Sequence, residues 1–528
     1  MPRSIPRFLA ETAARLPNKT AVASDVRSVS FAELQHEALT TAECLRQLGV
    51  RTGDRVGICM EKTVDQVAVI LGVLYANAVV VPILPRLKAP NIRHIITNSG
   101  MVAMVTDAQR VQEVTEFADL VKLVTGHGEI DERLPNLPYM RRHVQAQPFF
   151  DRIGADNAAI IYSSGSTGRP KGILIAHRNL ADGADIVAEY LGTSEDDRIG
   201  CVLSFNFDYG LNQIWQTIRK GATLYLHDFA LPNDLFAFLA KNAITAFPVM
   251  PVIITQMFDR RLSLSAGSHD LSKVRYVCST GGRLSDEMLK NLRSTFPAAK
   301  IFSMFGLTEA FRSTYLHPDK LDAHPTSIGK SIPGNQVMVL DENGVECAPN
   351  VVGELVHRGS TVSKGYWQDP ENTARVFRTH PAFPGETLVF SGDRVIRDEE
   401  GYPYFVARGD DMIKTRGFRV SPTEVEAEVL RHPDIVDAVA FAVPNIAVGE
   451  DVGCAYTTVS GAPLPEETLQ RFLKGALPRH MVPAYLLHFE RFPITGNAGK
   501  LDRKWIKQAA FERLNLAAPA TGASATAS

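Results

Sequence analysis

The chain has 528 residues, of which 45% are hydrophobic and 22% charged, and its formal net charge is −2. This length allows one large and one small domain, or three domains, with a sizeable core. The near-neutral charge excludes the basic footprint of a protein that binds nucleic acid or an anionic membrane. Six scattered cysteines form no C-x-x-C pair, so we expect reduced, mostly structural thiols and neither disulfides nor a zinc site.

The N-terminal region has two early prolines and no apolar run typical of a signal peptide, which predicts a cytoplasmic protein. The run QVAVILGVLYANAVVVPIL, residues 66–84, approaches the length of a membrane span. Because Ala-Asn-Ala interrupts this run and VVVPI has strand composition, we predict a helix followed by a buried strand. The small, polar residues 515–528 predict a disordered tail.

Strand-like and helical patterns alternate through the first three quarters of the chain. The order is strand in RVGICM, helix in 65–75, strand in VVVPIL, helix in IRHIITNSG and strand in MVAMVT. This alternation predicts an α/β fold with largely parallel sheets. From about residue 334 onward, QVMVLDENG, GELVHRG and YPYFVARGDDMIK predict short hairpin strands and therefore a β-rich subdomain.

The run from Arg408 to Arg416 is dense in charge and marks a candidate domain boundary. The sequence SPTE that follows predicts a capping box, with Ser421 as N-cap, Pro422 at the first helical position and Glu424 reaching back. IVDAVAFAVP then predicts a strand and PEETLQRFLKGAL a helix. Roughly the last 115 residues therefore predict a small α+β domain.

The stretch IYSSGSTGRPKG, residues 161–172, lies between two strand-like runs. Its glycines let backbone amides turn toward a ligand, its hydroxyls add hydrogen-bond groups, and Lys171 adds a positive charge. Together these features suit a polyphosphate. The alternative is a Gly/Ser turn of a hairpin with a solvated lysine. It is not an ordinary P-loop, because Lys171 is followed by Gly172 and a strand instead of a hydroxyl residue and a helix.

Six motifs in order, YSSGSTGRPKG, FGLTEA, GELVHRG, SGD, RGDDMIKTRGFRVSPTEVE and GNAGKLDR, resemble those of the adenylate-forming enzymes. These are the acyl-CoA synthetases, amino-acid adenylation domains and luciferases. The match covers nearly the whole chain. FGLTEAFRSTYL, SIGKSIP and KTRGFRVSPTEVE are most similar to the acyl ligases associated with exosortase gene clusters and to stand-alone adenylation enzymes that load carrier proteins.

The resemblance implies an α/β fold with a large N-terminal domain of two α/β subdomains plus a β-rich subdomain, and a small mobile α+β C-terminal domain. The expected bounds are 1–409 for the adenylation domain, 410–514 for the mobile domain and 515–528 for the tail.

The resemblance also implies an ATP site with Mg²⁺. The loop residues expected at the β- and γ-phosphates are Ser163, Ser164, Gly165, Ser166, Thr167, Gly168 and Lys171. Thr308 is expected at the α-phosphate, Glu309 as the Mg²⁺ ligand, and Gly281 and Phe305 around the nucleotide, with Phe305 against the adenine. Without the resemblance, Thr308 and Glu309 have the composition of a helix start.

Four further residues follow from the same resemblance. Asp393 is expected to accept hydrogen bonds from the ribose hydroxyls, with help from Arg408. Asp410 occupies the hinge position, although Ala407 stands where the family has glycine. Lys500 matches the catalytic lysine, which would stabilise the charge that develops when a carboxylate attacks the α-phosphate. PITGNAGK carries one apparent extra residue, which a glycine-rich loop tolerates.

The acid is expected to bind in a pocket lined by Asp208, Tyr209, Asn212, Pro248, Cys278, Thr280, Met304, Arg312 and Ser313. Asp208 stands where amino-acid adenylation domains place the aspartate that pairs with the substrate's amino group, since a buried ammonium needs a counter-charge. The alternative is that Asp208 caps a helix. For Arg312 two interpretations are open: it reads a second carboxylate of a dicarboxylic amino acid, or it is a structural arginine paired to a neighbouring acid.

We therefore expect an AMP-forming ligase that activates a carboxylic acid, and in particular an amino acid, as an acyl-adenylate. The acyl group would pass to the phosphopantetheine thiol of a separate carrier protein, because the chain ends without a fused carrier domain, or to coenzyme A. The alternatives are an acyl-CoA ligase for fatty or aryl acids and a nucleotide-binding regulator without catalysis. The presence of both Glu309 and Lys500 argues against the regulator.

Overall fold

The computed structural model describes residues 4–85, 87, 89–125, 134–164, 170–229, 231–258, 269–408, 413–415, 418–445, 449–495 and 500–516. The chain divides into two compact units. The first unit comprises Met1–Val337, His357–Val389 and Gly496–Ala498, and the second comprises Met338–Val356, Phe390–Thr495 and Gly499–Ser528. The expected boundary between residues 409 and 410 lies outside the described residues and stays a prediction.

A six-stranded sheet of the first unit carries the hairpin that was expected to bind phosphate. Its order is β6 (Val121–Thr125), β5 (Ala103–Asp107), β3 (Arg55–Cys59), β4 (Val79–Pro82), β7 (Asn157–Ser164) and β8 (Pro170–Ala176). All neighbours are parallel except β7 and β8, which form the antiparallel hairpin. The chain also forms α4 (Ala89–Ser99), η1 (Val111–Leu120) and α5 (Leu137–His143) along this part of the sequence.

A nine-stranded sheet of the first unit carries the expected acid pocket. Its order is β15 (Lys330–Ser331), β14 (Ala310–Leu316), β13 (Lys300–Leu307), β12 (Tyr276–Ser279), β11 (Ala246–Val249), β9 (Arg198–Cys201), β10 (Thr223–Leu226), β1 (Thr20–Ala23) and β2 (Ser28–Ser30). The strands from β13 to β1 are parallel, and β14, β15 and β2 are antiparallel to their neighbours. The predicted α/β pattern with largely parallel sheets is confirmed.

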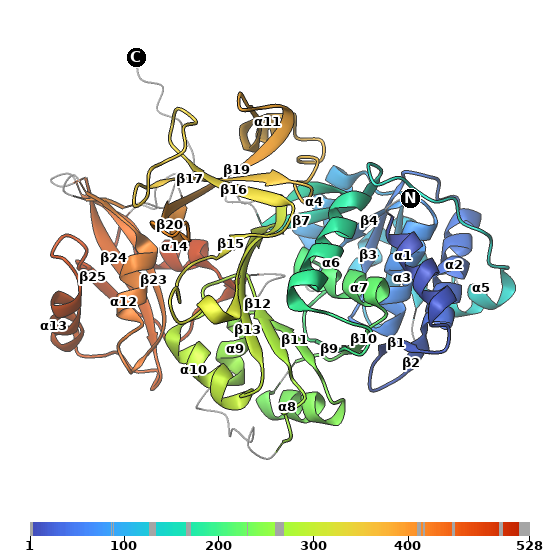
Figure 1. The fold of residues 1–528 in the computed structure, drawn as a ribbon, viewed down its shortest axis with the longest axis horizontal. Helices are drawn as coiled ribbons and strands as arrows, with labels where there is room; N and C mark the ends of the chain where they lie inside the picture. Colours follow the sequence, from blue (N-terminus) through green and yellow to red (C-terminus); the bar gives the residue numbers. More distant parts are fainter. Residues whose placement is uncertain are drawn as a thin grey trace. The chain divides into compact units, whose positions relative to one another are not determined.

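Helices of the first unit pack beside these sheets (Figure 1). Three of them, α1 (Ile5–Arg15), α2 (Phe31–Gln47) and α3 (Val64–Tyr75), lie side by side near the N-terminus. α6 (His177–Leu191) follows β8 directly and contacts α7 (Asp208–Lys220). The remaining helices are α8 (Pro232–Lys241), α9 (Pro251–Met257), α10 (Asp286–Thr295), the short η3 (Pro318–Lys320) and α11 (Pro370–Val376).

The apolar run 66–84 forms the end of α3 and the strand β4, as predicted. Every residue of α3 except Asp65 is buried, and all four residues of β4 are buried. In the described part of the chain, no helix has the length and hydropathy needed to cross a membrane. All six cysteines are buried thiols outside any disulfide, in agreement with the prediction of structural thiols.

The predicted β-rich segment forms a sheet in the order β16 (Asn335–Leu340), β17 (Gly353–Gly359), β19 (Phe383–Arg397) and β18 (Phe377–His380), with β20 (Pro403–Arg408) paired to β19. Strands β16, β17 and β19 each contain the residue at which the chain passes from one unit to the other.

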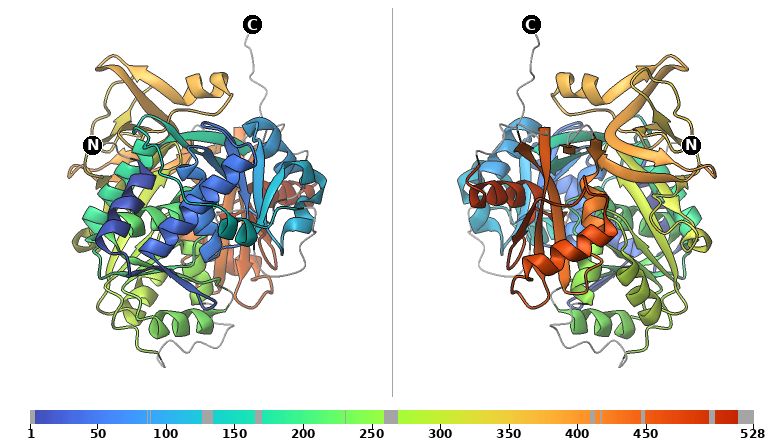
Figure 2. Two further views of the ribbon diagram at one scale, coloured as in Figure 1. Left: turned by 90° about the vertical axis from the view of Figure 1, so that its right-hand side faces the viewer. Right: turned by 90° about the vertical axis from the view of Figure 1, so that its left-hand side faces the viewer.

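The second unit contains the sheet β22 (Phe418–Val420), β21 (Ile413–Thr415), β24 (Gly449–Thr458) and β23 (Ile435–Asn445), with β25 (Tyr485–His488) beside β24. Alternate residues of β23 enter two cores. Ala438 and Ala440 pack with α12 (Pro422–Val429) and α13 (Glu466–Ala476), whereas Val439, Phe441 and Val443 pack with α14 (Arg503–Arg513). The right-hand view of Figure 2 shows these orange and red elements.

The start of α12 agrees with the predicted helix signal in part. Ser421 is the N-cap and Pro422 the first helical residue, and the Ser421 hydroxyl accepts a hydrogen bond of 3.4 Å from the Glu424 backbone amide. The same hydroxyl donates to the carbonyl of Val406. A short pair, β26 (Ile494–Thr495) with β27 (Lys500–Leu501), precedes α14.

Candidate active site

Lys171 lies on β8, opposite Ser163 of β7 in the antiparallel register. Its Nζ donates a hydrogen bond of 2.9 Å to Oδ1 of Asn372 and lies 5.3 Å from the ring centroid of Tyr366. Burial, and then the positive charge of Arg375, lower the pKa of Lys171, although Asp369 and Glu309 act in the opposite direction. The lysine is thus held in place by groups that lie about two hundred residues further along the chain.

The rest of the predicted phosphate loop lies outside the described residues. Gly165, Ser166, Thr167 and Gly168 are not described, and of Ser164 only the backbone in β7 is. Their assignment to ATP therefore stays a prediction. The two strands predicted on either side of the loop are confirmed as β7 and β8, and Ser164 pairs with Pro170 across them in an antiparallel hairpin.

Glu309 lies with Thr308 in the turn between β13 and β14, and Oε1 of Glu309 accepts a hydrogen bond of 2.7 Å from the Tyr366 hydroxyl. The interpretation of Thr308 and Glu309 as a helix start is wrong, because the next residues return as the antiparallel strand β14. Burial first, and then the Glu309 charge, raise the pKa of Tyr366 far above its ordinary value. The tyrosine hydroxyl therefore remains a donor to the carboxylate at all physiological pH values.

A groove opens beside Lys171. It is lined by His94, Asn98, Pro170, Lys171, Gly172, Tyr366, Trp367, Asp369 and Asn372. In the described ranges, no three His, Cys, Asp or Glu side chains gather at a place that could hold a metal ion. Glu309 by itself fits Mg²⁺, because this ion is ordinarily held by one or two carboxylates together with phosphate oxygens and water. The residues present therefore suit a metal that arrives with a nucleotide.

Asp208 is the first residue of α7, and the helix N-cap is Phe207, which makes no side-chain capping bond. Asp208 is thus not the N-cap itself, but its Oδ1 accepts a hydrogen bond of 2.7 Å from the backbone amide of Tyr209 in the first turn. The helix start is fixed by a close approach, since a Cβ on Gly210 would lie 1.8 Å from the Ser204 carbonyl oxygen.

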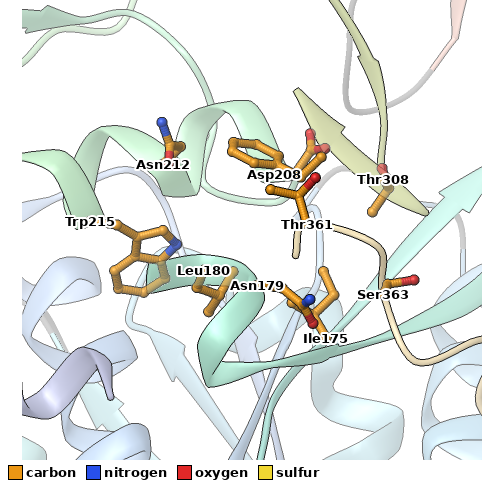
Figure 3. Close-up of a pocket in the computed structure, with 10 residues that line it drawn as sticks. Ile175, Asn179, Leu180, Asp208, Asn212, Trp215, Thr308, Thr361 and Ser363 are labelled. Carbon is orange, nitrogen blue, oxygen red and sulfur yellow. The ribbon is translucent and has the colours of Figure 1, made fainter. Parts of the chain in front are cut away.

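A narrow cavity lies at this end of α7 (Figure 3). Its lining residues come from β8, α6, α7, the β13–β14 turn, β14 and the segment after β17; they are Ile175, Asn179, Leu180, Asp208, Asn212, Trp215, Thr308, Phe311, Thr361 and Ser363. The cavity is therefore lined both by Asp208, the predicted partner of the substrate's amino group, and by Thr308, the predicted contact of the α-phosphate.

Three lining side chains carry polar atoms without a hydrogen-bond partner in the described structure. Asn212 is 1% exposed and neither atom of its amide group is paired, and Trp215 is 2% exposed with an unpaired indole Nε1. The buried Ser363 hydroxyl is unpaired as well. Since buried polar groups are nearly always satisfied, these atoms indicate a polar ligand or bound water in the cavity.

Four of the predicted pocket residues meet in a second, closely packed cluster. The Arg312 guanidinium lies 3.9 Å from the ring centroid of Tyr209, and its Nη1 is 3.2 Å from Sδ of Met304. The Tyr209 hydroxyl donates a hydrogen bond of 2.7 Å to the carbonyl of Cys278. Sequence positions 209, 278, 304 and 312 are thus brought together by α7, β12, β13 and β14.

The other predicted pocket residues lie nearby on the same sheet. Pro248 of β11 pairs with Cys278 of β12, and Thr280 follows β12 and is buried. Ser313 is buried on β14, but its hydroxyl donates a hydrogen bond of 2.8 Å to the carbonyl of Ala310. Ser313 is thus engaged with its own strand.

Phe305 on β13 stacks on His357 of β17, with ring centroids 6.5 Å apart and planes 15° from parallel. Gly281, just after β12, has a φ of +87°, a left-handed value that favours glycine. Their contact with a nucleotide stays a prediction.

Asp393, Arg408 and Lys500 belong to the second unit. Asp393 is buried in β19 and pairs across the sheet with the backbone of Arg408 in β20. The backbone of Lys500 pairs with Thr495, whereas its side chain lies outside the described residues, as does all of Asp410. Their roles toward ATP, the hinge and the acid stay predictions.

Sequence patterns did not predict the site residues Tyr366, Asn372, Trp215, Thr361 and Ser363. Tyr366 and Asn372 stand in KGYWQDPENT, where a tyrosine after glycine and a proline-started helix were visible signals of local structure. Their contacts to Glu309 and Lys171 span 57 and 201 residues, which no local pattern reveals.

Comparison with known proteins identifies related families. A family model described as AMP-binding enzyme matches residues 9–367, and one described as AMP-binding enzyme C-terminal domain matches residues 424–499. One of the linear gramicidin synthase subunits of Brevibacillus parabrevis is 31% identical over 501 residues, which are 94% of this chain and 9% of that protein. Surfactin synthase subunit 1 of Bacillus subtilis (strain 168) is 29% identical over 95% of this chain and 14% of its own length. The chain thus spans a small part of these relatives.

Solved structures share the fold. The anthranilate CoA ligase AuaEII in complex with anthranoyl-AMP has a TM-score of 0.88 and 22% identity, covering 98% of this chain and 99% of that one. ATP-bound MatB from Rhodopseudomonas palustris has a TM-score of 0.87 and 24% identity, covering 97% and 100%. These similarities confirm the predicted α/β class with a large N-terminal and a small C-terminal part.

Proposed function

The chain belongs to the AMP-binding enzyme family, and on this premise we propose that it is an ATP-dependent, AMP-forming ligase of carboxylic acids. In the first half-reaction a carboxylate oxygen attacks the α-phosphorus of ATP, the bond to the β-phosphate breaks, and pyrophosphate leaves. In the second, a thiol sulfur attacks the acyl carbon, the bond to AMP breaks, and the thiol proton passes to solvent. The products are AMP and a thioester.

The observation that carries this proposal is the joined group of Lys171, Tyr366 and Glu309. One tyrosine side chain places its ring 5.3 Å from a lysine ammonium and its hydroxyl 2.7 Å from a carboxylate. A cation held over the ring and a carboxylate held at its hydroxyl suit a polyphosphate that carries a divalent cation. The solved neighbour MatB is described as ATP-bound, which agrees with this assignment.

Mg²⁺ would be held by Glu309 and by phosphate oxygens, and it would neutralise charge on the departing pyrophosphate. The chain's own part is to orient the carboxylate, through the Tyr366 hydroxyl, and to hold Lys171 through Asn372. Thr308 lies beside Glu309 in the same turn and lines the cavity that Asp208 also lines. The acid and the α-phosphate would thus meet at the cavity mouth.

We assign the acid pocket to this cavity and the substrate's amino group to Asp208. The support is that Asp208 lines the cavity from the first position of α7, and that an ammonium in a largely buried site needs a counter-charge. The relatives named as gramicidin and surfactin synthases favour an amino acid and a carrier-protein thiol as acceptor. The neighbour described as an anthranilate CoA ligase supports the alternative, an acyl-CoA ligase.

The experiment compares amino acids with their des-amino analogues in a pyrophosphate-release assay, using the wild type and Asp208→Ala. The wild type should prefer the amino substrate, and Asp208→Ala should raise its KM by at least tenfold while reducing the penalty for the des-amino analogue. Asp234→Ala is the matched control, because Asp234 is also a first-turn aspartate, of α8. Equal activity of wild type and Asp208→Ala toward amino substrates would contradict the assignment.

The acceptor is tested separately by supplying the adenylate with coenzyme A or with a purified carrier protein that bears phosphopantetheine. Thioester formation on the carrier, at least tenfold more efficient than with coenzyme A, is expected. The reverse preference would establish the acyl-CoA ligase. If the protein binds ATP but releases no pyrophosphate with any acid, the result would instead favour a regulator without catalysis.

A further inference from the structure

Arg312 is a buried guanidinium in an irregular part of the nine-stranded sheet. The residue is 3% exposed and has a φ of +53°, a left-handed value that is rare outside glycine. The register between β13 and β14 shifts between Phe305 and Leu307, and a Cβ on Gly306 would lie 2.6 Å from the Arg312 amide nitrogen. Strained backbone of this kind is concentrated at functional positions.

The contacts of the Arg312 guanidinium are with weak partners. It lies 3.9 Å from the ring centroid of Tyr209 and 5.1 Å from that of Phe311, and Nη1 reaches the Met304 sulfur at 3.2 Å. A thioether sulfur is a poor acceptor. Nη2 is buried and has no hydrogen-bond partner among the described residues. The stacking holds the plane of the group and leaves donor N–H groups unused.

No carboxylate of the described chain pairs with Arg312, which is unlike another largely buried arginine of the first unit. The Arg141 side chain is 11% exposed and lies 3.4 Å from both Glu37 and Asp65. The titratable side chains that face Arg312 are Tyr190, Tyr209 and Cys278. Burial raises the pKa of each of them, for Cys278 to about 11, so all three are neutral near pH 7.

This removes the interpretation of Arg312 as a structural arginine paired to a neighbouring acid, at least within the described residues. Burying a permanently charged guanidinium without an anion lowers the free energy of unfolding. The planar group donates two parallel hydrogen bonds, for which a carboxylate is the favoured acceptor. Its neighbour along the chain, Phe311, lines the cavity at Asp208, and Tyr209 directly follows Asp208. The guanidinium therefore packs against one residue of the cavity wall, Phe311, and against the residue that follows Asp208.

We propose that Arg312 binds a second carboxylate of the substrate, so that the acid activated is a dicarboxylic one, and with Asp208 an amino acid with an acidic side chain. This inference rests on the proposed function. One carboxylate would be adenylated near Thr308, and the other would form paired hydrogen bonds with the guanidinium, including the unused Nη2.

The test is a pyrophosphate-release panel built from matched pairs that differ in one charge: glutamate with glutamine, 2-aminoadipate with norleucine, and glutarate with pentanoate. The wild type should prefer the diacid of at least one pair by tenfold or more in kcat/KM. Arg312→Met, which keeps length and apolar volume, should lose most of that preference, and Arg312→Lys should retain part of it. Arg219→Met is the control; Arg219 lies in the last turn of α7 and pairs with Asp185.

The outcomes separate the two proposals. Arg312 does not bind a substrate carboxylate if the wild type releases pyrophosphate only with monocarboxylic acids. The same conclusion follows if Arg312→Met lowers the rates with both members of a pair equally. In both cases the ligase assignment stands. If no acid supports pyrophosphate release, the ligase assignment itself fails. Thermal midpoints of the variants are measured alongside. Because the wild-type panel alone can overturn the proposal, the test still decides if a variant fails to fold.

Discussion

The hydroxyl of Tyr366 donates a hydrogen bond of 2.7 Å to Oε1 of Glu309. The same tyrosine ring lies 5.3 Å from Nζ of Lys171, so one side chain from the segment after β17 touches both charged groups of the proposed ATP site. This arrangement makes Tyr366 a positioning residue. It fixes one oxygen of the carboxylate and leaves the other for a metal ion.

Tyr366→Phe should therefore weaken Mg²⁺ use without removing the metal ligand. A hydrogen bond to a charged group contributes about 1.5–3 kcal/mol, which corresponds to a tenfold or larger loss in kcat/KM at limiting Mg²⁺. Pyrophosphate release measured as a function of Mg²⁺ concentration should show a raised half-saturation that high Mg²⁺ partly restores. Tyr139→Phe, at an exposed tyrosine, is the control. An unchanged Mg²⁺ dependence would show that the tyrosine does not orient Glu309.

We expect kcat/KM for ATP to fall at alkaline pH because Lys171 loses its proton. Burial and the neighbouring Arg375 lower the pKa of Lys171 below the ordinary lysine value of about 10.4. As the pH rises through this lowered pKa, the ammonium loses its proton and its attraction for phosphate, so kcat/KM for ATP should fall.

Profiles of kcat/KM for ATP from neutral pH into the alkaline range measure this effect, with thermal midpoints recorded over the same range. In Lys171→Arg the alkaline fall should move to higher pH, because a guanidinium stays charged there. The same alkaline limb in the wild type and in Lys171→Arg would assign the titration to another group.

We expect the free energy of unfolding to fall at acidic pH because of His177. It is buried, its Nδ1 accepts a hydrogen bond of 3.4 Å from the Ile5 amide, and burial lowers its pKa to about 4. The unfolded histidine titrates near pH 6.5, as in model peptides. As the pH falls below that value, only the unfolded state takes up this proton, so the free energy of unfolding should fall by about 1.4 kcal/mol per pH unit until about pH 4.

Denaturant midpoints measured between neutral pH and about pH 4 test this window. His177→Asn should flatten the slope, whereas His36→Asn, at an exposed histidine, should leave it as in the wild type. His357, whose pKa burial lowers to about 3, should account for part of the remaining slope. A slope that His177→Asn does not change would exclude this histidine as a source of acid sensitivity.

Lys500→Ala should abolish adenylate formation while ATP binding and thermal stability stay close to those of the wild type. A cation that contacts only the charge developing at the α-phosphate contributes to the transition state and little to folding. ATP affinity, thermal midpoint and pyrophosphate exchange are measured on the same preparation. Lys504→Ala, a nearby exposed lysine on α14, is the control. Normal exchange in Lys500→Ala would mean that the extra residue in PITGNAGK has placed another group at the α-phosphate.

Local patterns predicted elements better than contacts. The run 66–84 resolved into helix and strand because the Ala-Asn-Ala interruption and the β-branched VVVP segment are properties of neighbouring residues. The start of α7 was one residue off, because Phe207 takes the extended N-cap conformation that aspartate usually adopts. Thr308 and Glu309 suggested a helix start by composition, but antiparallel pairing of β13 with β14 makes them a turn.

The site itself could be predicted only as far as its motifs reach. Lys171 was found from its glycine- and hydroxyl-rich segment, whereas Glu309 and Asp208 were assigned only through the resemblance of their motifs to those of the adenylate-forming enzymes. Tyr366 was missed because its role depends on a hydrogen bond across 57 residues. The unpaired atoms of Asn212 and Trp215 were missed for a similar reason, because satisfaction of a buried polar group depends on packing from several elements.

ATP–pyrophosphate exchange across amino, fatty and aryl acids tests the central claim most directly, with Glu309→Gln as the paired variant and ATP binding measured independently. We predict exchange that requires both Mg²⁺ and a carboxylic acid, is strongest with an amino acid, and is lost in Glu309→Gln while ATP still binds. Absence of exchange with every acid, from a wild-type protein that binds ATP normally, would contradict it.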